Sequence, residues 1–283
     1  MHIHGYAVVL ATLSLSACLL AARVWIYLLK IHLQQACKMR ALDESFMVLF
    51  LVSIVSICAY MPWTSRGLHS TACGGSPTRF GNQESYLEYL KGISDLPQGF
   101  SVGTARFNFR PYEVDKTLPM NLTLIMTEKP TDSFAAMFTS NKFPGGPIIV
   151  GKERIKSSPF LQAVAINNKI SNVCPGGSTD YGAGDSDQVC QAVADQLGLP
   201  SKTLVFPSST GIIGWRLPVD AIKAGVPIAA KNMQSKSIYP AAVGITTTDR
   251  YPKVRSMSGG GKAWSIVAIA KGAGMIGKVL KKL

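Results

Sequence analysis

The chain has 283 residues, with 29 Lys and Arg against 16 Asp and Glu, and a formal net charge of +13. This charge favours acidic partners, but the basic residues are scattered and form no stripe with interleaved aromatics, which argues against nucleic-acid binding. Six cysteines without a C-x-x-C pair argue against a disulfide framework and a zinc site. All four histidines lie at or before position 69, which excludes Ser-His and Cys-His nucleophile pairs from the later part of the chain.

Residues 1–83 differ in composition from residues 84–283, and we treat the two parts as separate domains. The first part contains two apolar stretches, residues 6–22 and 46–63, each near the length of about twenty residues that crosses a bilayer. They predict an apolar helical segment ahead of the second domain. In this interpretation the chain is anchored in a membrane through residues 6–63.

A second signal overlaps the end of this part. Residues 61–83 contain Arg66, Arg79, several Ser and Thr and no acidic residue, as is typical of a mitochondrial transit peptide. Because such signals act from the N-terminus, this interpretation places the true start at or near Met61. We favour this interpretation, which puts the protein in the mitochondrial matrix, and keep the membrane anchor as the alternative.

Residues 84–283 have the pattern of an α+β domain. Short apolar runs predict strands at residues 122–126, 134–138, 148–150, 163–166, 204–206 and 265–270. A helix is predicted over residues 185–198, where Asp185 suits the cap, apolar residues recur every four positions and Gly198 ends the pattern. A second helix is predicted to start at Pro218.

Residues 146–153, GPIIVGKE, approach the phosphate-binding pattern G-x-x-x-x-G-K-[ST]. Glu153 stands where the pattern needs a hydroxyl, and the middle of the segment is apolar rather than rich in glycine. We therefore expect a buried strand that ends in basic residues here, and no nucleotide site.

The stretch LVFPSSTGIIGWRLPVD, residues 204–220, carries the strongest chemical signal. Thr210 and Gly211 can direct a hydroxyl and a backbone N–H to one point, as an oxyanion hole requires. The same residues also suit an ordinary turn whose hydroxyls bond the local backbone. The residues alone do not decide between an oxyanion hole and an ordinary turn.

Two further stretches follow. Residues 244–253, GITTTDRYPK, cluster three threonines, an aspartate and a lysine, which suits either a polar, amino-acid-like ligand or the cap of a turn. Lys271 follows an apolar run and precedes Gly272, an arrangement that brings backbone and an ammonium close to a partner.

Taken in order, these motifs resemble a known family. STGIIG before a Leu-Pro helix start, then TTD…PK, then KGAGMI, are similar to motifs of the ornithine acetyltransferase/glutamate N-acetyltransferase family of arginine biosynthesis. Two upstream segments, FAAMFTSNKFPGG and AVAINNKISNVCPGG, also resemble it, although Lys169 and Ile170 stand where small residues are commoner. The resemblance runs from about residue 99 to 276 and implies a layered αββα domain.

The resemblance implies a role for each of four residues. Thr210 and Gly211 would form the oxyanion hole, and Thr247 and Lys271 would bind the substrate. The family's nucleophile is a threonine that self-cleavage frees as a new amino terminus, and acetyl passes through it from N2-acetylornithine to glutamate.

The resemblance also implies the partners. Substrates are N-acetylornithine and glutamate, some members take acetyl from acetyl-CoA, and no metal or other cofactor is needed. The chain would be the α chain of a heterotetramer that has two α and two β chains.

The chain departs from the family after Ile276. Residues 277–283 read GKVLKKL, and no threonine follows Thr248. We therefore expect a domain that is incomplete at its C-terminal side and does not catalyse acetyl transfer alone. The alternative function is a truncated, non-catalytic, membrane-held binding protein or subunit.

Overall fold

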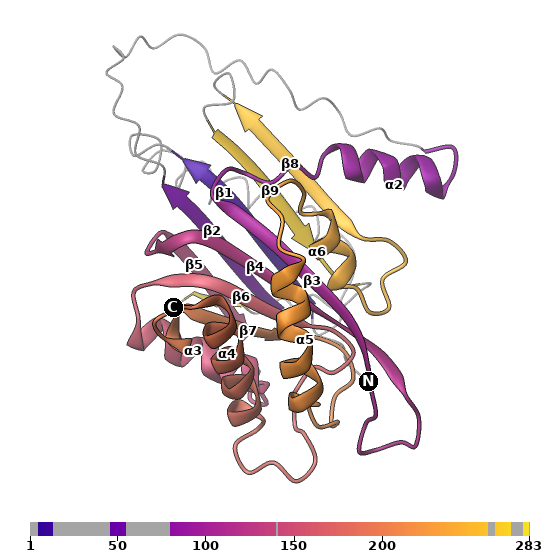
Figure 1. Cartoon of the computed structure of the whole chain (residues 1–283), viewed down its shortest axis with the longest axis vertical. Coiled ribbons are helices and arrows are strands. Elements are labelled where there is room, and N and C mark those ends of the chain that lie inside the picture. The colour runs from indigo at the N-terminus through magenta and orange to yellow at the C-terminus, as the bar shows by residue number, and fades with distance from the viewer. Residues whose placement is uncertain are drawn as a thin grey trace.

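The structure is a computed structural model that describes residues 5–13, 46–54, 80–139, 141–259, 264–272 and 280–282. Within these residues the chain forms two β-sheets and several helices (Figure 1). The smaller sheet has four strands, in the order β3 (Phe100–Phe109), β4 (Leu118–Thr131), β6 (Leu161–Asn167) and β7 (Val205–Ser209). Its neighbours are antiparallel except for β6 and β7, which run parallel.

The larger sheet has six strands and draws them from distant parts of the chain. Their order is β10 (Leu280–Lys282), β5 (Phe134–Thr139), β2 (Phe46–Ile54), β1 (Gly5–Leu13), β9 (Trp264–Ala270) and β8 (Lys253–Gly259). The two central strands, β1 and β2, are parallel, and the other pairs are antiparallel. The C-terminal end of β9 therefore lies inside the sheet, one strand from its edge.

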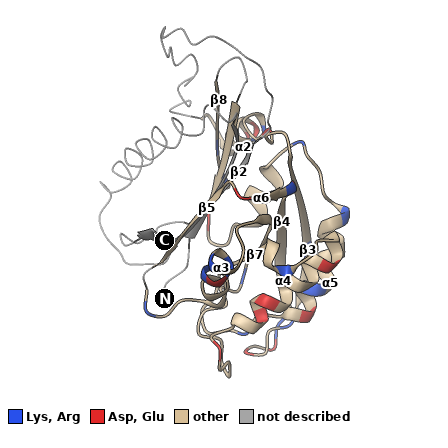
Figure 2. Cartoon of the chain, turned by 90° about the vertical axis from the view of Figure 1, so that its left-hand side faces the viewer, with Lys and Arg blue, Asp and Glu red and all other residues tan. Residues whose placement is uncertain are grey.

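The two sheets pack face to face, and helices cover the outer face of the smaller one (Figures 1 and 2). One apolar core lies between the sheets and includes Phe138, Phe206 and Ile269. A second core lies between the smaller sheet and two helices, α4 (Ala183–Leu197) and α5 (Val219–Lys231). Burial of apolar area in these two layers is the main stabilising term expected for such an arrangement.

Three further helices and a 3₁₀ turn complete the described fold. Helix α2 (Gln83–Gly92) is capped by Asn82, whose side chain accepts from the Ser85 N–H. Helix α3 (Gly146–Ser157) packs against β7 and α4, and α6 (Tyr239–Gly244) lies against strands of both sheets. The 3₁₀ turn η1 (Lys202–Leu204) leads directly into β7.

Most of the predicted elements are present. The strands predicted at residues 122–126, 134–138, 163–166 and 265–270 lie within β4, β5, β6 and β9, and the one at 204–206 overlaps β7. The two predicted helices are α4 and α5, and Gly198 ends α4 in a left-handed conformation, as expected. The cap of α4 was assigned wrongly: Gly182 is the N-cap, Asp185 lies inside the first turn, and Asp180 accepts from the Gly184 N–H.

The strand predicted at residues 148–150 is wrong, because these residues form the first turns of α3. Three β-branched residues favour a strand locally. The segment begins with Gly145 as N-cap and Pro147 in the first turn, which suits a helix start. The residues that follow, up to Ser157, continue the helix and decide the outcome.

The predicted apolar helices near the N-terminus are wrong for residues 6–13 and 46–54, which lie in β1 (Gly5–Leu13) and β2 (Phe46–Ile54). A short apolar run does not distinguish a buried helix from a buried strand, and here the sheet takes both runs as its central strands. Residues 14–22 and 55–63 and most of the transit-like segment, 61–79, lie outside the described residues. None of the described helices combines the length and hydrophobicity that a membrane span requires.

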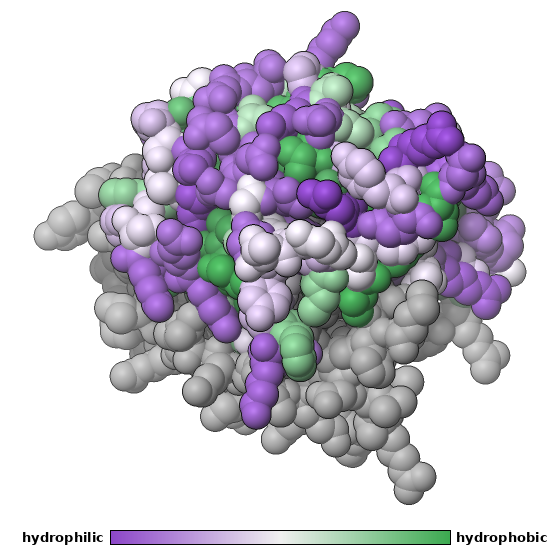
Figure 3. All heavy atoms as spheres, turned by 90° about the horizontal axis from the view of Figure 1, so that it is seen from below, coloured by the Kyte–Doolittle hydropathy of each residue, from purple (hydrophilic) through white to green (hydrophobic). Residues whose placement is uncertain are grey.

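The described part is thus a mixed α+β domain with one helical layer on the smaller sheet. The second helical layer of an αββα arrangement and the domain division at residue 83 stay predictions. Seen from below, hydrophilic side chains cover much of the described surface, and apolar ones lie between them in small groups (Figure 3). Such a surface is ordinary for a folded domain.

Candidate active site

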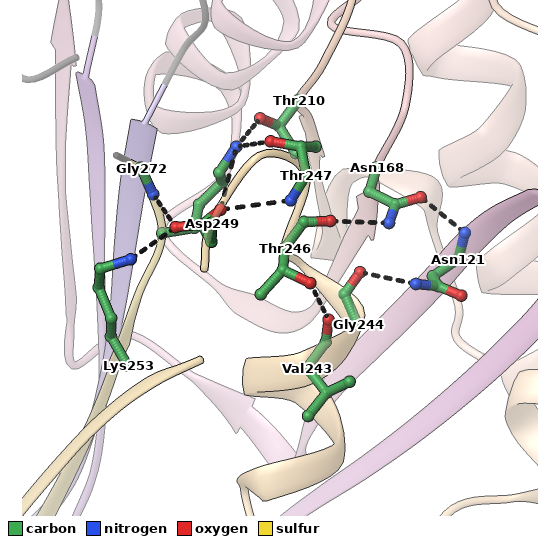
Figure 4. Close-up of polar contacts among 11 residues, drawn as sticks. Asn121, Asn168, Thr210, Val243, Gly244, Thr246, Thr247, Asp249, Lys253 and Gly272 are labelled. Carbon is green, nitrogen blue, oxygen red and sulfur yellow. Dashed lines mark hydrogen bonds and ion pairs between the residues drawn. The ribbon is translucent and has the colours of Figure 1, made fainter. Parts of the chain in front are cut away.

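The site lies where three segments meet between the two sheets (Figure 4). The first is the end of β7, which leads into Thr210. The second is the loop after α6, which carries Thr247 and Asp249, and the third is the exit of β9 at Lys271. The side chains of Thr210 and Lys271 are buried, although both are polar, and buried polar groups need partners.

The turn at Thr210 and Gly211 rests on the backbone that follows β6. The carbonyl of Asn167 accepts from the Thr210 N–H at 3.0 Å, and the carbonyl of Lys169 accepts from the Ile212 N–H at 2.8 Å. The Gly211 N–H between them makes no hydrogen bond to any residue that the structure describes. An N–H that the fold leaves unpaired beside a threonine hydroxyl is the arrangement that an oxyanion hole requires.

Glycine is required at position 211. Its φ is +138°, and a Cβ added there would lie 2.1 Å from the carbonyl carbon and oxygen of Lys169. Real Cβ atoms do not approach backbone so closely, and few side chains adopt this φ. The close approach keeps the Gly211 N–H at the end of β7.

Asn167 fixes this turn with its side chain. Its Oδ1 accepts from the Ser209 hydroxyl at 2.6 Å, and its Nδ2 donates to the carbonyls of Asn168 and Ile170 at 3.2 and 2.9 Å. All of these contacts are buried. The Asn167 side chain therefore joins β7 to the turn that follows β6.

The ammonium of Lys271 reaches across from the larger sheet. It donates to the hydroxyl of Thr210 at 2.8 Å and to that of Thr247 at 2.5 Å, and its side chain is 0% exposed. Burial lowers the pKa of Lys271 to about 8; the carboxylate of Asp249 opposes this shift and the ammonium of Lys253 adds to it. Lys271 can therefore change its charge near neutral pH.

Asp249 organises the charged side of the site. Its carboxylate accepts from the N–H groups of Thr247 and Gly272 at 3.2 and 2.7 Å, and from the Lys253 ammonium at 2.6 Å. Burial acts to raise the pKa of Asp249, but these three hydrogen bonds together lower it below the usual value. Asp249 is thus an anion in the interior, 3.9 Å from the Lys271 ammonium.

A chain of amides holds the loop after α6 in place. Asn168 accepts at Oδ1 from the Asn121 N–H at 2.7 Å and donates from Nδ2 to the Thr246 carbonyl at 2.9 Å. Asn121 donates to the Gly244 carbonyl at 3.4 Å. These contacts connect strands β4 and β6 to the residue next to Thr247.

The structure brings together all four residues that the sequence singled out. Thr210, Gly211, Thr247 and Lys271 lie in one cluster although they come from three segments, while their individual roles stay predictions. Sequence reasoning missed Asp249 and Asn167. Asp249 lies inside the TTD…PK motif, but nothing in that motif indicates which groups it contacts. Within the described residues no group of three or more His, Cys, Asp and Glu could hold a metal ion.

Comparison with known proteins finds a match to the ArgJ family over residues 108–280. The arginine biosynthesis bifunctional protein ArgJ of Nitratidesulfovibrio vulgaris is 33% identical over 186 residues, which are 65% of this chain and 45% of that protein. The ArgJ protein of Geobacter sulfurreducens is 35% identical over 173 residues, 60% of this chain and 42% of that protein. The chain thus spans less than half the length of these curated relatives.

A solved structure has a similar fold. It is the ornithine acetyltransferase of Mycobacterium tuberculosis, crystallised in complex with ornithine. The similarity has a TM-score of 0.56 with 26% sequence identity, and it covers 67% of this chain and 97% of that one.

Proposed function

Because the chain belongs to the ArgJ family, we propose that it acts in arginine biosynthesis as part of an acetyltransferase that moves acetyl from N2-acetylornithine to glutamate. The observation that carries the proposal is the meeting of Thr210 and Gly211 with Lys271 and Thr247 in one buried cluster. The similarity to a structure that binds ornithine supports an ornithine-like ligand.

Each group has a chemical task in this proposal. The Gly211 N–H and the Thr210 hydroxyl stabilise the negative charge that forms on the acetyl oxygen when a nucleophile attacks its carbonyl carbon. In other enzymes one such donor contributes about a hundredfold to a thousandfold in kcat. The Lys271 ammonium, with Thr247 beside it, binds the substrate.

The nucleophile in the proposal is a threonine oxygen. It attacks the acetyl carbonyl, the C–N bond of N-acetylornithine breaks, and the amine of ornithine leaves with the proton that the threonine gave up. The amine of glutamate then attacks the ester, which returns the threonine and yields N-acetylglutamate. The α-amine of that threonine serves as the base, which suits a domain without histidine.

In the proposal this threonine is the first residue of a β chain that self-cleavage frees. Two α and two β chains form a heterotetramer, and acetyl-CoA is a second acetyl donor. A mitochondrial matrix location, argued from the composition of residues 61–83, belongs to the same proposal.

Calorimetric titration of the full chain with N-acetyl-L-ornithine tests the substrate assignment. We expect saturable binding that falls by about a hundredfold in Lys271→Met, because a buried charged contact contributes on the order of 2–3 kcal/mol. Lys231→Met, which removes an exposed lysine at the end of α5, is the matched control and retains binding. Equal affinity in the protein and in Lys271→Met would contradict the proposal.

An assay of acetyl transfer to labelled glutamate tests the reaction itself. It uses the protein purified with whatever chains accompany it, and transfer should be lost in Gly211→Ala. Binding of N-acetyl-L-ornithine without transfer would favour the alternative of a non-catalytic binding subunit.

A further inference from the structure

Two charged residues beside Lys271 have no part in the reaction as proposed. Asp249 and Lys253 form an ion pair at 2.6 Å, in which the Asp249 side chain is 1% exposed and the Lys253 side chain 42%. A buried carboxylate needs full hydrogen bonding to be tolerated, and here three donors supply it. Figure 4 shows Asp249 and Lys253 joined in this pair, and Asp249 Oδ2 lies 3.9 Å from the Lys271 ammonium.

The two oxygens of Asp249 are used differently. Oδ1 accepts from the Lys253 ammonium and from the Gly272 N–H at 2.7 Å. Oδ2 accepts from the Thr247 N–H at 3.2 Å and lies 3.9 Å from the Lys271 Nζ. That last distance is too long for a hydrogen bond, yet the opposite charges still attract strongly at this range.

This geometry leaves Lys271 with a donor to spare. An ammonium has three N–H groups, and the hydroxyls of Thr210 and Thr247 take two. Among the described residues no third acceptor lies within hydrogen-bond distance. Asp249 would be that acceptor if it moved closer by about an ångström, and its bonds to Lys253 and Gly272 hold it back.

We propose that the Asp249–Lys253 ion pair positions the Lys271 ammonium for its ligand. Asp249 supplies the negative charge that keeps the ammonium protonated, and Lys253 holds Asp249 at a distance, so that one N–H remains for a carbonyl or carboxylate oxygen of the ligand. The inference rests on the proposed function for the statement that Lys271 meets a ligand. The positioning itself depends only on groups within this chain.

The two members of the pair act on Lys271 with opposite signs. Burial lowers the pKa of Lys271 to about 8, the charge of Asp249 raises that pKa, and the charge of Lys253 lowers it. These are the charged groups that act on Lys271 within the described residues. Removing Asp249 therefore favours the neutral amine, and removing Lys253 favours the ammonium, both directly and by freeing Asp249 to approach.

Nuclear magnetic resonance of the full chain, labelled with ¹³C at lysine Cε, measures this directly. In the unchanged protein one lysine signal should titrate near pH 8, well below the usual value of about 10.4, and it should be missing in Lys271→Met. We expect the midpoint of this signal to fall in Asp249→Asn and to rise in Lys253→Met. The exposed Lys231→Met serves as the control and leaves the midpoint unchanged.

Two results would overturn the proposal: midpoints that move in the same direction in the two variants, or a Lys271 signal that neither variant shifts. Lys253 is half exposed, so Lys253→Met tests the idea even if Asp249→Asn does not fold. The titration midpoint of Lys271 should be higher in Asp249→Glu, which keeps the negative charge, than in Asp249→Asn.

A ligand measurement separates this inference from the proposed function. Lys253→Met should bind N-acetyl-L-ornithine about tenfold more weakly, because Asp249 then takes the third N–H of Lys271. If the titration midpoints shift as expected but the unchanged protein binds no N-acetyl-L-ornithine, the proposed function fails and the positioning stands. If the protein binds and Lys253→Met binds equally well, the positioning fails.

Discussion

The two sides of the candidate site are held in different ways. On the β7 side, Thr210 and Gly211 are fixed by backbone hydrogen bonds, by the close approach of Gly211 to Lys169, and by the amide of Asn167. On the β9 side, Lys271 is fixed by hydroxyls and by charges. The groups that fix the β7 side are backbone groups and an uncharged amide, whereas those that fix the β9 side include two ammonium groups and a carboxylate.

The two sides should therefore tolerate different changes, one in pH and the other in side-chain shape. Close-packed backbone does not adjust to an added atom, so the β7 side should be sensitive to shape and indifferent to pH. Charges act over several ångströms and depend on protonation, so the β9 side should be sensitive to pH and more tolerant of small changes in shape. Four measurements test this contrast.

Gly211→Ala should have the largest effect, because the new methyl group would meet the Lys169 carbonyl and the residue would need a φ of +138°. We expect the free energy of unfolding to fall by about 3–5 kcal/mol, measured by urea denaturation. Gly176→Ala is the matched control, since its nearest contact would be an ordinary 3.7 Å. A loss of less than about 1 kcal/mol in Gly211→Ala would show that the β7 side adjusts to an added methyl group, which contradicts the expected sensitivity to shape.

Asn167→Ala removes three buried hydrogen bonds and leaves the Ile170 carbonyl without this donor. A loss of about 2–3 kcal/mol in the free energy of unfolding is expected, and it should be equal at pH 6 and pH 9. If the loss of unfolding free energy differed between pH 6 and pH 9, the β7 side would also depend on pH, and the expected difference between the two sides would be wrong. Denaturation at the two pH values is the measurement.

Lys271 should make stability depend on pH. Its pKa is about 8 in the folded protein and near 10.5 in the unfolded chain, so between these values the unfolded state binds more protons. The free energy of unfolding should therefore rise with pH across this window, by up to about 2–3 kcal/mol from Lys271 alone. Below pH 8 the cost of the buried charge is fully present.

Subtracting the pH profile of Lys271→Met from that of the unchanged protein isolates this contribution from those of other lysines and tyrosines. A difference that stays constant from pH 8 to 10.5 would show that Lys271 titrates as an ordinary exposed lysine.

Lys169→Gly should have the smallest effect and the opposite sign. Lys169 has a φ of +71°, a conformation that costs a side chain energy and glycine almost none. We expect a gain of about 0.5–1 kcal/mol in the free energy of unfolding, after the extra freedom of glycine in the unfolded chain is deducted. Lys169→Ala keeps the Cβ and is the control; an equal gain there would assign the effect to the lysine side chain and not to the backbone.

The sequence predicted those parts of the fold that local patterns determine. The core strands β4, β6 and β9 and the helix α4 show clear apolar patterns. Strand β3 was missed because Gly103 and Arg106 interrupt its pattern, and its pairing with β4 outweighs both. Residues 148–150 and the two N-terminal apolar runs were assigned wrongly because short apolar runs suit either structure and distant partners decide.

The site shows the same limit. Thr210, Gly211, Thr247 and Lys271 were found through a resemblance of ordered motifs, and the structure brings them together. No pattern along the chain could show that Asp249 would pair with Lys253 and stand 3.9 Å from Lys271, or that Asn167 would bridge to Ser209. Such contacts join residues from different segments, and only the folded arrangement sets them.

The position of β1 also affects how the chain folds. β1 pairs with β2 on one side and with β9 on the other, where Ala7 lies opposite Ala270, so the second of its two partners comes more than 250 residues later in the chain. Loop closure over such a separation is slow, and topologies rich in distant contacts fold slowly. During synthesis, at about 5–20 residues per second, β1 waits for a time on the order of tens of seconds before β9 exists. An apolar strand that leaves the ribosome so long before its second partner is a natural substrate for chaperones.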